Sequence, residues 1–135
     1  MSVVRLTTGE AWSLLRRSDH GVLATVHADR GVDAVPVVFV VDANRILSPV
    51  DAVKAKSTAR LQRLANLERD QRCALLVDHY EDDWSALWWV RVHGTATVVA
   101  GRHGALTAFE QYRDDGAVTA TIVLEPTLVT GWRAG

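Results

Sequence analysis

Lysines, hydroxyl side chains and an arginine are concentrated in one short stretch, residues 48–60 (SPVDAVKAKSTAR). The stretch joins the end of an expected strand, residues 46–50, to the start of an expected helix. A helix N-terminus presents free backbone N–H groups and the positive end of the helix dipole, and both attract anions. The same dipole opposes lysines, so a bound anion would resolve the conflict. The stretch favours a phosphate-binding site; a solvated basic turn is the alternative.

Three tryptophans lie within six residues, at Trp84, Trp88 and Trp89. Neighbouring residues of a strand point to opposite faces of a sheet, so Trp88 and Trp89 are expected to face different surroundings. One ring can serve the core while the other lies at a subunit interface or over a planar ring; packing of both in the core is the alternative. Together with the basic stretch, this segment describes a place for a planar, phosphorylated ligand.

Residues 32–41 form a nearly continuous apolar run that is broken only by Asp33 and Pro36. Continuous apolar sequence predicts a strand that is buried on both faces. Proline donates no backbone hydrogen bond, so Pro36 marks an edge or a bulge. The free backbone there belongs either to an ordinary edge strand or to a surface that faces a flat ligand.

The rest of the sequence predicts mostly strands that are joined by tight turns. Thr7 and Glu10 have capping-box spacing for a first short helix, and Gly94 marks a bulge in a long strand. Strands are expected at residues 21–27, 32–41, 46–50, 73–80, 87–99 and, as one or two strands, 120–132; further helices are expected within 54–72 and at 104–113. Six or seven strands with three short helices predict a mainly β domain with a closed antiparallel sheet.

The composition of the chain argues against several classes of protein, among them nucleic-acid-binding and membrane-spanning proteins. The 135 residues allow a single domain, residues 1–135, and a hydrophobic fraction of 48% supplies its core. Fifteen Lys and Arg against sixteen Asp and Glu give a net charge of −1, which argues against a nucleic-acid partner. No apolar run approaches the roughly 18 residues of a membrane span, and the N-terminus lacks a secretion signal. With a single cysteine, Cys73, a cytoplasmic, reducing setting is expected.

Common catalytic and metal-binding signatures are absent from the sequence. It contains no GxGxxG after a strand, no phosphate-binding P-loop and no GxSxG elbow. Its five histidines are scattered, and the adjacent Asp78 and His79 would point to opposite faces of a strand. We therefore expect no metal site and nominate no catalytic side chain.

Two segments of the chain resemble the actinobacterial deazaflavin-dependent oxidoreductases of the pyridoxamine 5′-phosphate oxidase-like superfamily. They are residues 54–72 (KAKSTARLQRLANLERDQR) and residues 75–96 (LLVDHYEDDWSALWWVRVHGTA). The resemblance covers residues 21–99 most closely. It implies a split β-barrel, a homodimer with cofactor sites at its interface, and hydride transfer from reduced coenzyme F420 to a small acceptor such as an activated alkene, imine or quinone. The alternatives are an FMN-dependent oxidoreductase of the same fold and a non-catalytic flavin- or tetrapyrrole-binding protein.

The same resemblance assigns cofactor-binding positions. The ring is expected against Val35, Pro36 and Val37, with further contacts from Ser48, Pro49 and Val50. The phosphate is expected at Lys54, Lys56, Ser57 and Arg60. Trp89 and Arg91 match positions from which the partner subunit closes the pocket. Two positions that are often basic in similar sequences are Ser57 and Ala59 here, so the cationic cluster is thinner.

Overall fold

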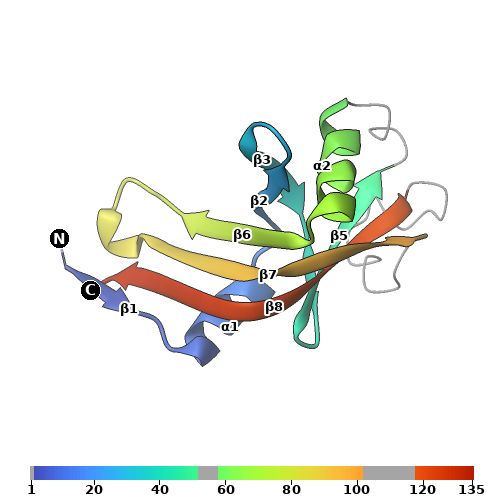
Figure 1. Cartoon of the computed structure of the whole chain (residues 1–135). Coiled ribbons are helices and arrows are strands. Elements are labelled where there is room, and N and C mark those ends of the chain that lie inside the picture. Colours follow the sequence, from blue (N-terminus) through green and yellow to red (C-terminus); the bar gives the residue numbers. More distant parts are fainter. Residues whose placement is uncertain (1, 52–57, 102–117) are drawn as a thin grey trace.

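The structure is a computed structural model that describes residues 2–51, 58–101 and 118–135. These ranges hold eight strands and two α-helices (Figure 1). The strands are β1 (Val3–Arg5), β2 (His20–His27), β3 (Gly31–Val38), β4 (Val40–Asp42), β5 (Arg45–Asp51), β6 (Arg72–His79), β7 (Trp88–Ala100) and β8 (Val118–Ala134). The helices are α1 (Thr8–Arg16) and α2 (Thr58–Arg69), and a single 3₁₀ turn, η2, spans Trp84–Ala86.

All the strands belong to one antiparallel sheet. Its order is β3-β2-β6-β7-β8-β5-β4, and β1 pairs with β8. The longest strands, β7 and β8, run the length of the molecule side by side, while α2 stands against the sheet at one end and α1 lies along β8 (Figure 1). This arrangement confirms the predicted mainly β, antiparallel split-barrel fold.

Local signals in the sequence explain how α1 begins and what it buries. The Thr7 hydroxyl accepts a hydrogen bond from the Glu10 backbone N–H at 3.1 Å, and the Thr7 N–H donates to the Glu10 carboxylate at 3.0 Å. This is the predicted capping box, which satisfies two N–H groups that the helix itself leaves free. Ala11 and Leu15 then place the apolar side of α1 in the core.

The apolar run 32–41 departs from its prediction. It divides into β3 and β4, and one face of β3 is exposed: Val32 is 67% exposed, whereas Val37 is only 8% exposed. Burial on both faces was therefore the wrong expectation. The same side of the sheet is exposed at Val22 of β2 and Leu76 of β6, so the exposure belongs to this whole side of the sheet. In addition, β3 stands at the edge of the sheet, where Pro36 needs no hydrogen-bonding partner for its nitrogen, as predicted.

The final segment is one strand, β8, which passes through Pro126 without a break. The register between β7 and β8 shifts at His93/Gly94, and Pro126 lies opposite Gly94. The irregularity predicted at Gly94 is confirmed, but the extra residue of the bulge is Thr127 of β8, between the partners of His93 and Gly94. The helix expected at residues 104–113 lies outside the described residues. Neither described α-helix has the length and apolar character needed to cross a membrane.

Candidate functional site

Four residues on four neighbouring strands form a line across the sheet. Pro36 of β3 lies opposite Val22 of β2, which lies opposite Leu76 of β6, which lies opposite Arg91 of β7. Direct cross-strand partners point to the same side of a sheet, and we call this side the outer face. Val22 and Leu76 are 39% and 41% exposed. Apolar side chains exposed in a line suit a flat ligand or a protein partner.

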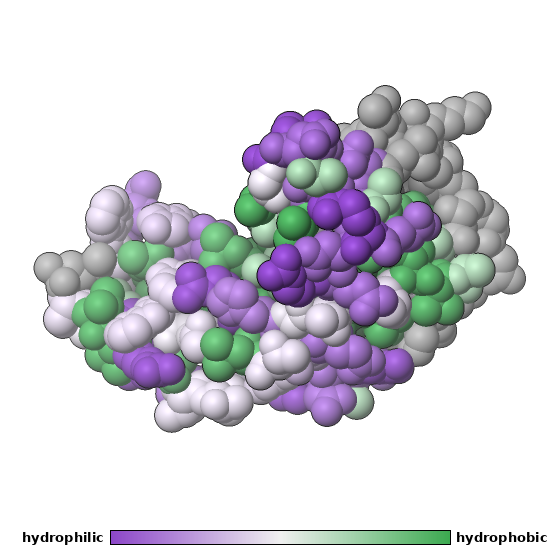
Figure 2. Space-filling view, in the orientation of Figure 1, coloured by the Kyte–Doolittle hydropathy of each residue, from purple (hydrophilic) through white to green (hydrophobic). Residues whose placement is uncertain are grey.

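A shallow hollow lies beside this line. Ala34, Ala24 and Ala74 follow one another across β3, β2 and β6, and His93 of β7 lies opposite Ala74. The hollow has a volume of about 240 Å³, and Ala24, Ala74 and His93 are among its lining residues. Hydrophobic side chains are exposed between polar ones on the surface over β6, β7 and β8 (Figure 2). The small alanine side chains let a planar group approach the backbone of the sheet closely.

Two buried polar atoms on the outer face lack a hydrogen-bond partner among the described residues. They are Nδ1 of His93 and Oγ1 of Thr130, a β8 residue that lies opposite Arg91. A buried polar atom left unpaired costs about 1–3 kcal/mol. The side chains of the outer face therefore include two buried polar atoms for which the described residues supply no partner.

Trp89 and Arg91, both predicted to bind the cofactor, lie on this outer face of β7. The guanidinium carbon of Arg91 lies 5.4 Å from the ring centroid of Trp89. Trp88 points to the opposite side, where it packs against the core and stacks on His79 with the ring centroids 6.0 Å apart. The prediction that the two adjacent tryptophans face different surroundings is thus confirmed.

The three residues expected against the ring divide between the two sides of β3. Pro36 lies on the outer face in line with Arg91. Val37 belongs to the core, and Val35 packs against it. Only the backbone of these two valines is therefore available to a ligand on the outer face, while Pro36 can offer its ring.

Ser48, Pro49 and Val50 are buried in β5. The Ser48 hydroxyl donates a hydrogen bond to the Val38 carbonyl at 2.8 Å, so it already ties β5 to the end of β3. Val50 belongs to the core cluster. The contacts of these three residues with a cofactor stay a prediction.

The predicted phosphate site lies mostly outside the described residues. Lys54, Lys56 and Ser57 precede the described part of α2, and the side chain of Arg60 is likewise outside it. The assignment of these four residues to a phosphate therefore stays a prediction from the sequence.

A buried polar network, which the sequence analysis missed, fixes α2 to the β2–β3 hairpin. The side-chain amide of Asn66 donates to the Thr25 hydroxyl and to the Asp33 carboxylate, both at 3.0 Å, and accepts from Gln62 at 2.9 Å. Arg30 donates two further bonds to Asp33, at 3.0 and 2.8 Å. The hydrogen bonds from Arg30 and Asn66 lower the pKa of Asp33 below its ordinary value. The spacing of Leu61, Leu64 and Leu67 gave no signal for it, because Asn66 lies on the opposite side of a helix from these leucines.

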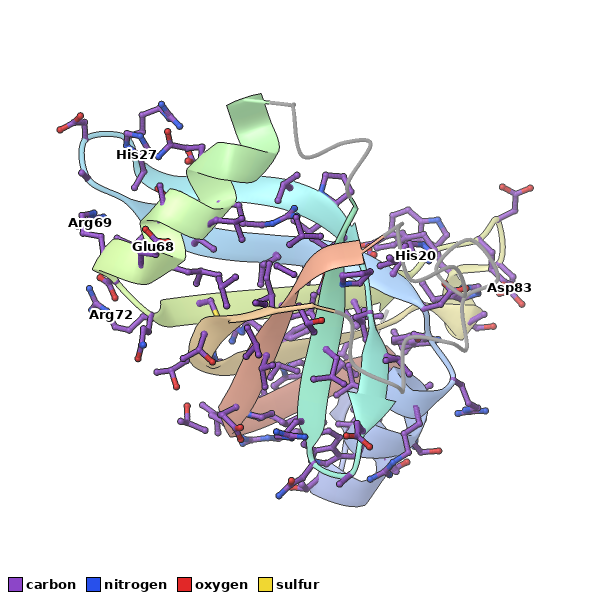
Figure 3. The ribbon with its side chains drawn as sticks, turned by 90° about the vertical axis from the view of Figure 1, so that its right-hand side faces the viewer. His20, His27, Glu68, Arg69, Arg72 and Asp83 are labelled. Atoms are coloured by element: carbon purple, nitrogen blue, oxygen red, sulfur yellow. The ribbon has the colours of Figure 1, made fainter. Side chains whose placement is uncertain are left out.

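Other charged groups lie at the ends of the sheet. His27, Arg69 and Arg72 lie at one end and His20 and Asp83 at the other (Figure 3). At the first end the Arg69 guanidinium donates to the Val26 carbonyl at 2.9 Å, which attaches the last turn of α2 to β2. Together with the Asn66 hydrogen bonds, this contact positions α2 on the sheet.

His79 is the last residue of β6. It lies on the strand position opposite Trp88, on the side away from the outer face, and its Nε2 is 2.6 Å from the Glu81 carboxylate. His79 therefore does not point to the outer face.

Comparisons with known proteins identify the family and the fold of the chain. The sequence profile of the family described as Pyridoxamine 5′-phosphate oxidase matches residues 7–133. A FAD-binding protein from Mesorhizobium loti is 17% identical with a TM-score of 0.77, and each chain is covered completely, at 100%. The FAD binding protein from Mycobacterium smegmatis is 23% identical with a TM-score of 0.67 and 98% coverage of both chains.

A structure described as an F420 reductase is 23% identical with a TM-score of 0.64, and the match covers 87% of this chain and 93% of that one. No curated protein sequence matches the chain. Because the family profile spans nearly the whole length, the chain belongs to the pyridoxamine 5′-phosphate oxidase family, whose split barrel is a fold that binds flavin-type cofactors.

Proposed function

We propose that this protein is a homodimeric, coenzyme F420-dependent oxidoreductase that acts on a small organic acceptor. The observation that carries the proposal is the outer face, where an apolar line of side chains ends at the stacked Trp89–Arg91 pair. Family membership supports a flavin-type cofactor, and the F420 reductase neighbour supports the deazaflavin among them. When bound, the reduced cofactor supplies a hydride to an activated alkene, imine or quinone.

The residues of the chain would hold and orient the reactants. Pro36, Val22 and Leu76 offer a flat apolar support for a tricyclic ring. The buried polar atoms of His93 and Thr130 lie beside it and have no partner in the described part of the chain. The basic stretch before α2 would hold the phosphate through Lys54, Lys56, Ser57 and Arg60. Fixing two reactants in reacting geometry can lower a barrier by about 7–11 kcal/mol, so no nucleophilic side chain is required.

A second copy of the chain completes this site in the proposal. Trp89 and Arg91 of one subunit would close the pocket over Pro36 and the neighbouring apolar side chains of the other subunit. Burial of Val22 and Leu76 in such an interface would remove the largest apolar side chains of the line from water. The exposed outer face therefore supports a homodimer.

A flavin in place of the deazaflavin is the second candidate. Two structural neighbours are described as FAD-binding proteins, which supports FAD or FMN on the same face. A phosphate of either flavin needs the same charge-assisted donors as that of the deazaflavin.

A cofactor titration followed by a turnover assay tests the proposal. The purified protein is titrated with coenzyme F420, FMN and FAD, and the reduced form of the best ligand is then mixed with enones, imines, quinones and biliverdin. We expect saturable binding of F420 and its reoxidation by at least one acceptor. Saturable flavin binding without a response to F420 overturns the cofactor assignment. Tight F420 binding without reoxidation by any acceptor indicates a binding protein instead of an enzyme.

A further inference from the structure

A second pocket lies between α1 and the ends of β7 and β8, on the side of the sheet opposite the outer face. Its volume is about 440 Å³, and it is lined by Leu6, Leu14, Trp88, Glu10, Arg17 and Arg133, among others. Small-molecule sites have volumes of roughly 300–1,000 Å³. Trp88 belongs to this pocket and Trp89 to the outer face, so the two sites share no side chain.

Two arginines on the rim of the pocket are only weakly engaged. Among the described residues, neither Arg17 nor Arg133 has a carboxylate within ion-pair distance. Each donates one long hydrogen bond, at 3.4 Å, to a backbone carbonyl, of Ser13 and Ala134 respectively. A guanidinium carries five N–H donors, so most of them remain available.

Glu10 supplies the one carboxylate among the described residues that line the pocket, and it is already engaged. Glu10 accepts the Thr7 N–H of the capping box at 3.0 Å, and this hydrogen bond is the main cause of its lowered pKa. Two guanidinium groups therefore face a single carboxylate, and the pocket keeps a net positive charge. The charge balance favours an anionic ligand.

The walls of the pocket are apolar. Leu6 precedes α1 and Leu14 lies within it, and both line the pocket. Trp88 of β7 adds an indole ring next to its cross-strand partner Arg133 of β8. An aromatic ring packs well against tryptophan, and a carboxylate matches the planar fork of arginine. A ring and a carboxylate in one molecule would use both features.

Gly9 gives access to the pocket for a test by substitution. It lies in the first turn of α1 and lines the pocket, and a Cβ atom added to it would meet nothing within 4 Å. Its φ angle is not in the left-handed region, so the backbone accepts other residues here. A methyl group at this position is therefore tolerated, whereas a large side chain can occupy the space of the pocket.

We infer that this pocket binds a small aromatic carboxylate of one or two fused rings, with its ring against Trp88 and its carboxylate at Arg17 and Arg133. The inference does not depend on the proposed redox function, because the site shares no side chain with the outer face.

The test compares 2-naphthoate with its neutral analogue 2-naphthamide by calorimetry and by the NMR shifts of the indole and guanidinium N–H groups. We expect the carboxylate to bind at least about tenfold more tightly than the amide, which is the effect of one charge-assisted contact. Arg133→Gln and Arg17→Gln should each weaken naphthoate binding about tenfold. The matched control is Arg16→Gln, because Arg16 lies on the same helix but stacks on Trp12 outside the pocket, and it should leave the affinity unchanged.

A second pair of variants tests the position of the ligand. Gly9→Phe should fill the pocket and abolish binding, while Gly9→Ala should retain it; far-UV circular dichroism checks that both keep α1. Naphthoate should bind equally well when the flavin-type cofactor is saturating. Equal affinity for acid and amide, no effect of Arg133→Gln, or competition with the cofactor would each overturn the assignment.

Discussion

Trp89 and Arg91 form a single stacked unit on β7, with the guanidinium carbon 5.4 Å from the centre of the indole ring. An exposed cation–π contact of this kind is worth about 0.5–1 kcal/mol. The unit lies at the end of the apolar line that runs through Leu76 and Val22 to Pro36. A planar cation and an aromatic ring thus lie together at the end of the apolar line.

Replacement of Trp89 by alanine should weaken cofactor binding about tenfold, equivalent to about 1.4 kcal/mol, because it removes an aromatic contact and frees Arg91. Arg91→Ala should have a similar effect, and the double variant should lose less than the sum of the two, since they act together. Fluorescence titration measures the affinities. Trp84→Ala is the control, because Trp84 is exposed on η2. An equal loss in the control would contradict a specific role for Trp89.

Leu76→Glu should convert the proposed dimer to a monomer, because it places a carboxylate in the middle of the apolar line. The folded monomer should survive, since Leu76 is already partly exposed in it. Analytical ultracentrifugation measures the mass. Val99→Glu is a matched control, because Val99 is an exposed valine of β7 beyond the Gly94 bulge. A Leu76→Glu protein that remains dimeric would show that the subunits associate through another surface.

Asn66→Ala should lower the free energy of unfolding by about 1–3 kcal/mol, because it leaves buried polar partners unsatisfied. Asn66→Asp should be more harmful at pH 7, since a second carboxylate would face Asp33 at hydrogen-bonding distance. Its stability should partly recover as the pH is lowered and one carboxyl is protonated. Urea unfolding at pH 7 and pH 5 checks this, with the exposed Ala65→Ser as the control. A pH-independent loss in Asn66→Asp would rule out repulsion from Asp33.

The hydrogen bonds from Arg72 lower the pKa of Asp70 from 3.8 to about 2. Because the folded-state value lies below the ordinary one, the stabilisation is present above pH 3.8 and is lost as the pH falls towards 2. Arg72→Gln should raise the pKa of Asp70 back towards 3.8, which a carbon-13 NMR titration of the carboxyl measures. Arg45→Gln should leave it unchanged. An Asp70 pKa near 3.8 in the unmodified protein would contradict the observed pairing.

Burial raises the pKa of the Cys73 thiol from 9.0 to about 11. This lowers the thiolate fraction at pH 8 about a hundredfold, and the thiolate is the nucleophile. Iodoacetamide should therefore modify the folded protein at least about a hundred times more slowly than the protein in urea. Mass spectrometry of timed samples measures both rates. Comparable rates would show that Cys73 is accessible and ionised in the folded chain.

Signals that act over a few residues predicted the structure best. The Thr7–Glu10 capping box, the Gly94 bulge and the opposite orientations of Trp88 and Trp89 depend only on neighbours in sequence, and all three are confirmed. The division of residues 32–41 into β3 and β4 was not predictable in the same way. Which side of β3 is exposed depends on how β2, β3 and β6 combine into one sheet, and β2 and β6 are distant in the sequence.

In the candidate site, too, the features that depend on residues distant in the sequence could not be predicted. The resemblance assigned Trp89, Arg91 and Pro36 to the cofactor, and the structure places all three on the outer face. Ser48, in contrast, is engaged by the Val38 carbonyl of another strand, and sequence spacing does not reveal that partner. Asn66 was overlooked because its partners, Thr25 and Asp33, lie far from it in the chain.

The strand β8 follows every other described strand along the chain, yet it pairs with β1, β5 and β7. During synthesis on the ribosome, the sheet therefore cannot close until β8 has emerged. Until then the long edge of β7 stays unpaired, and such an edge can recruit strands of other chains. Pairing between remote segments also slows folding. The nascent chain thus passes through an interval in which it needs protection from aggregation.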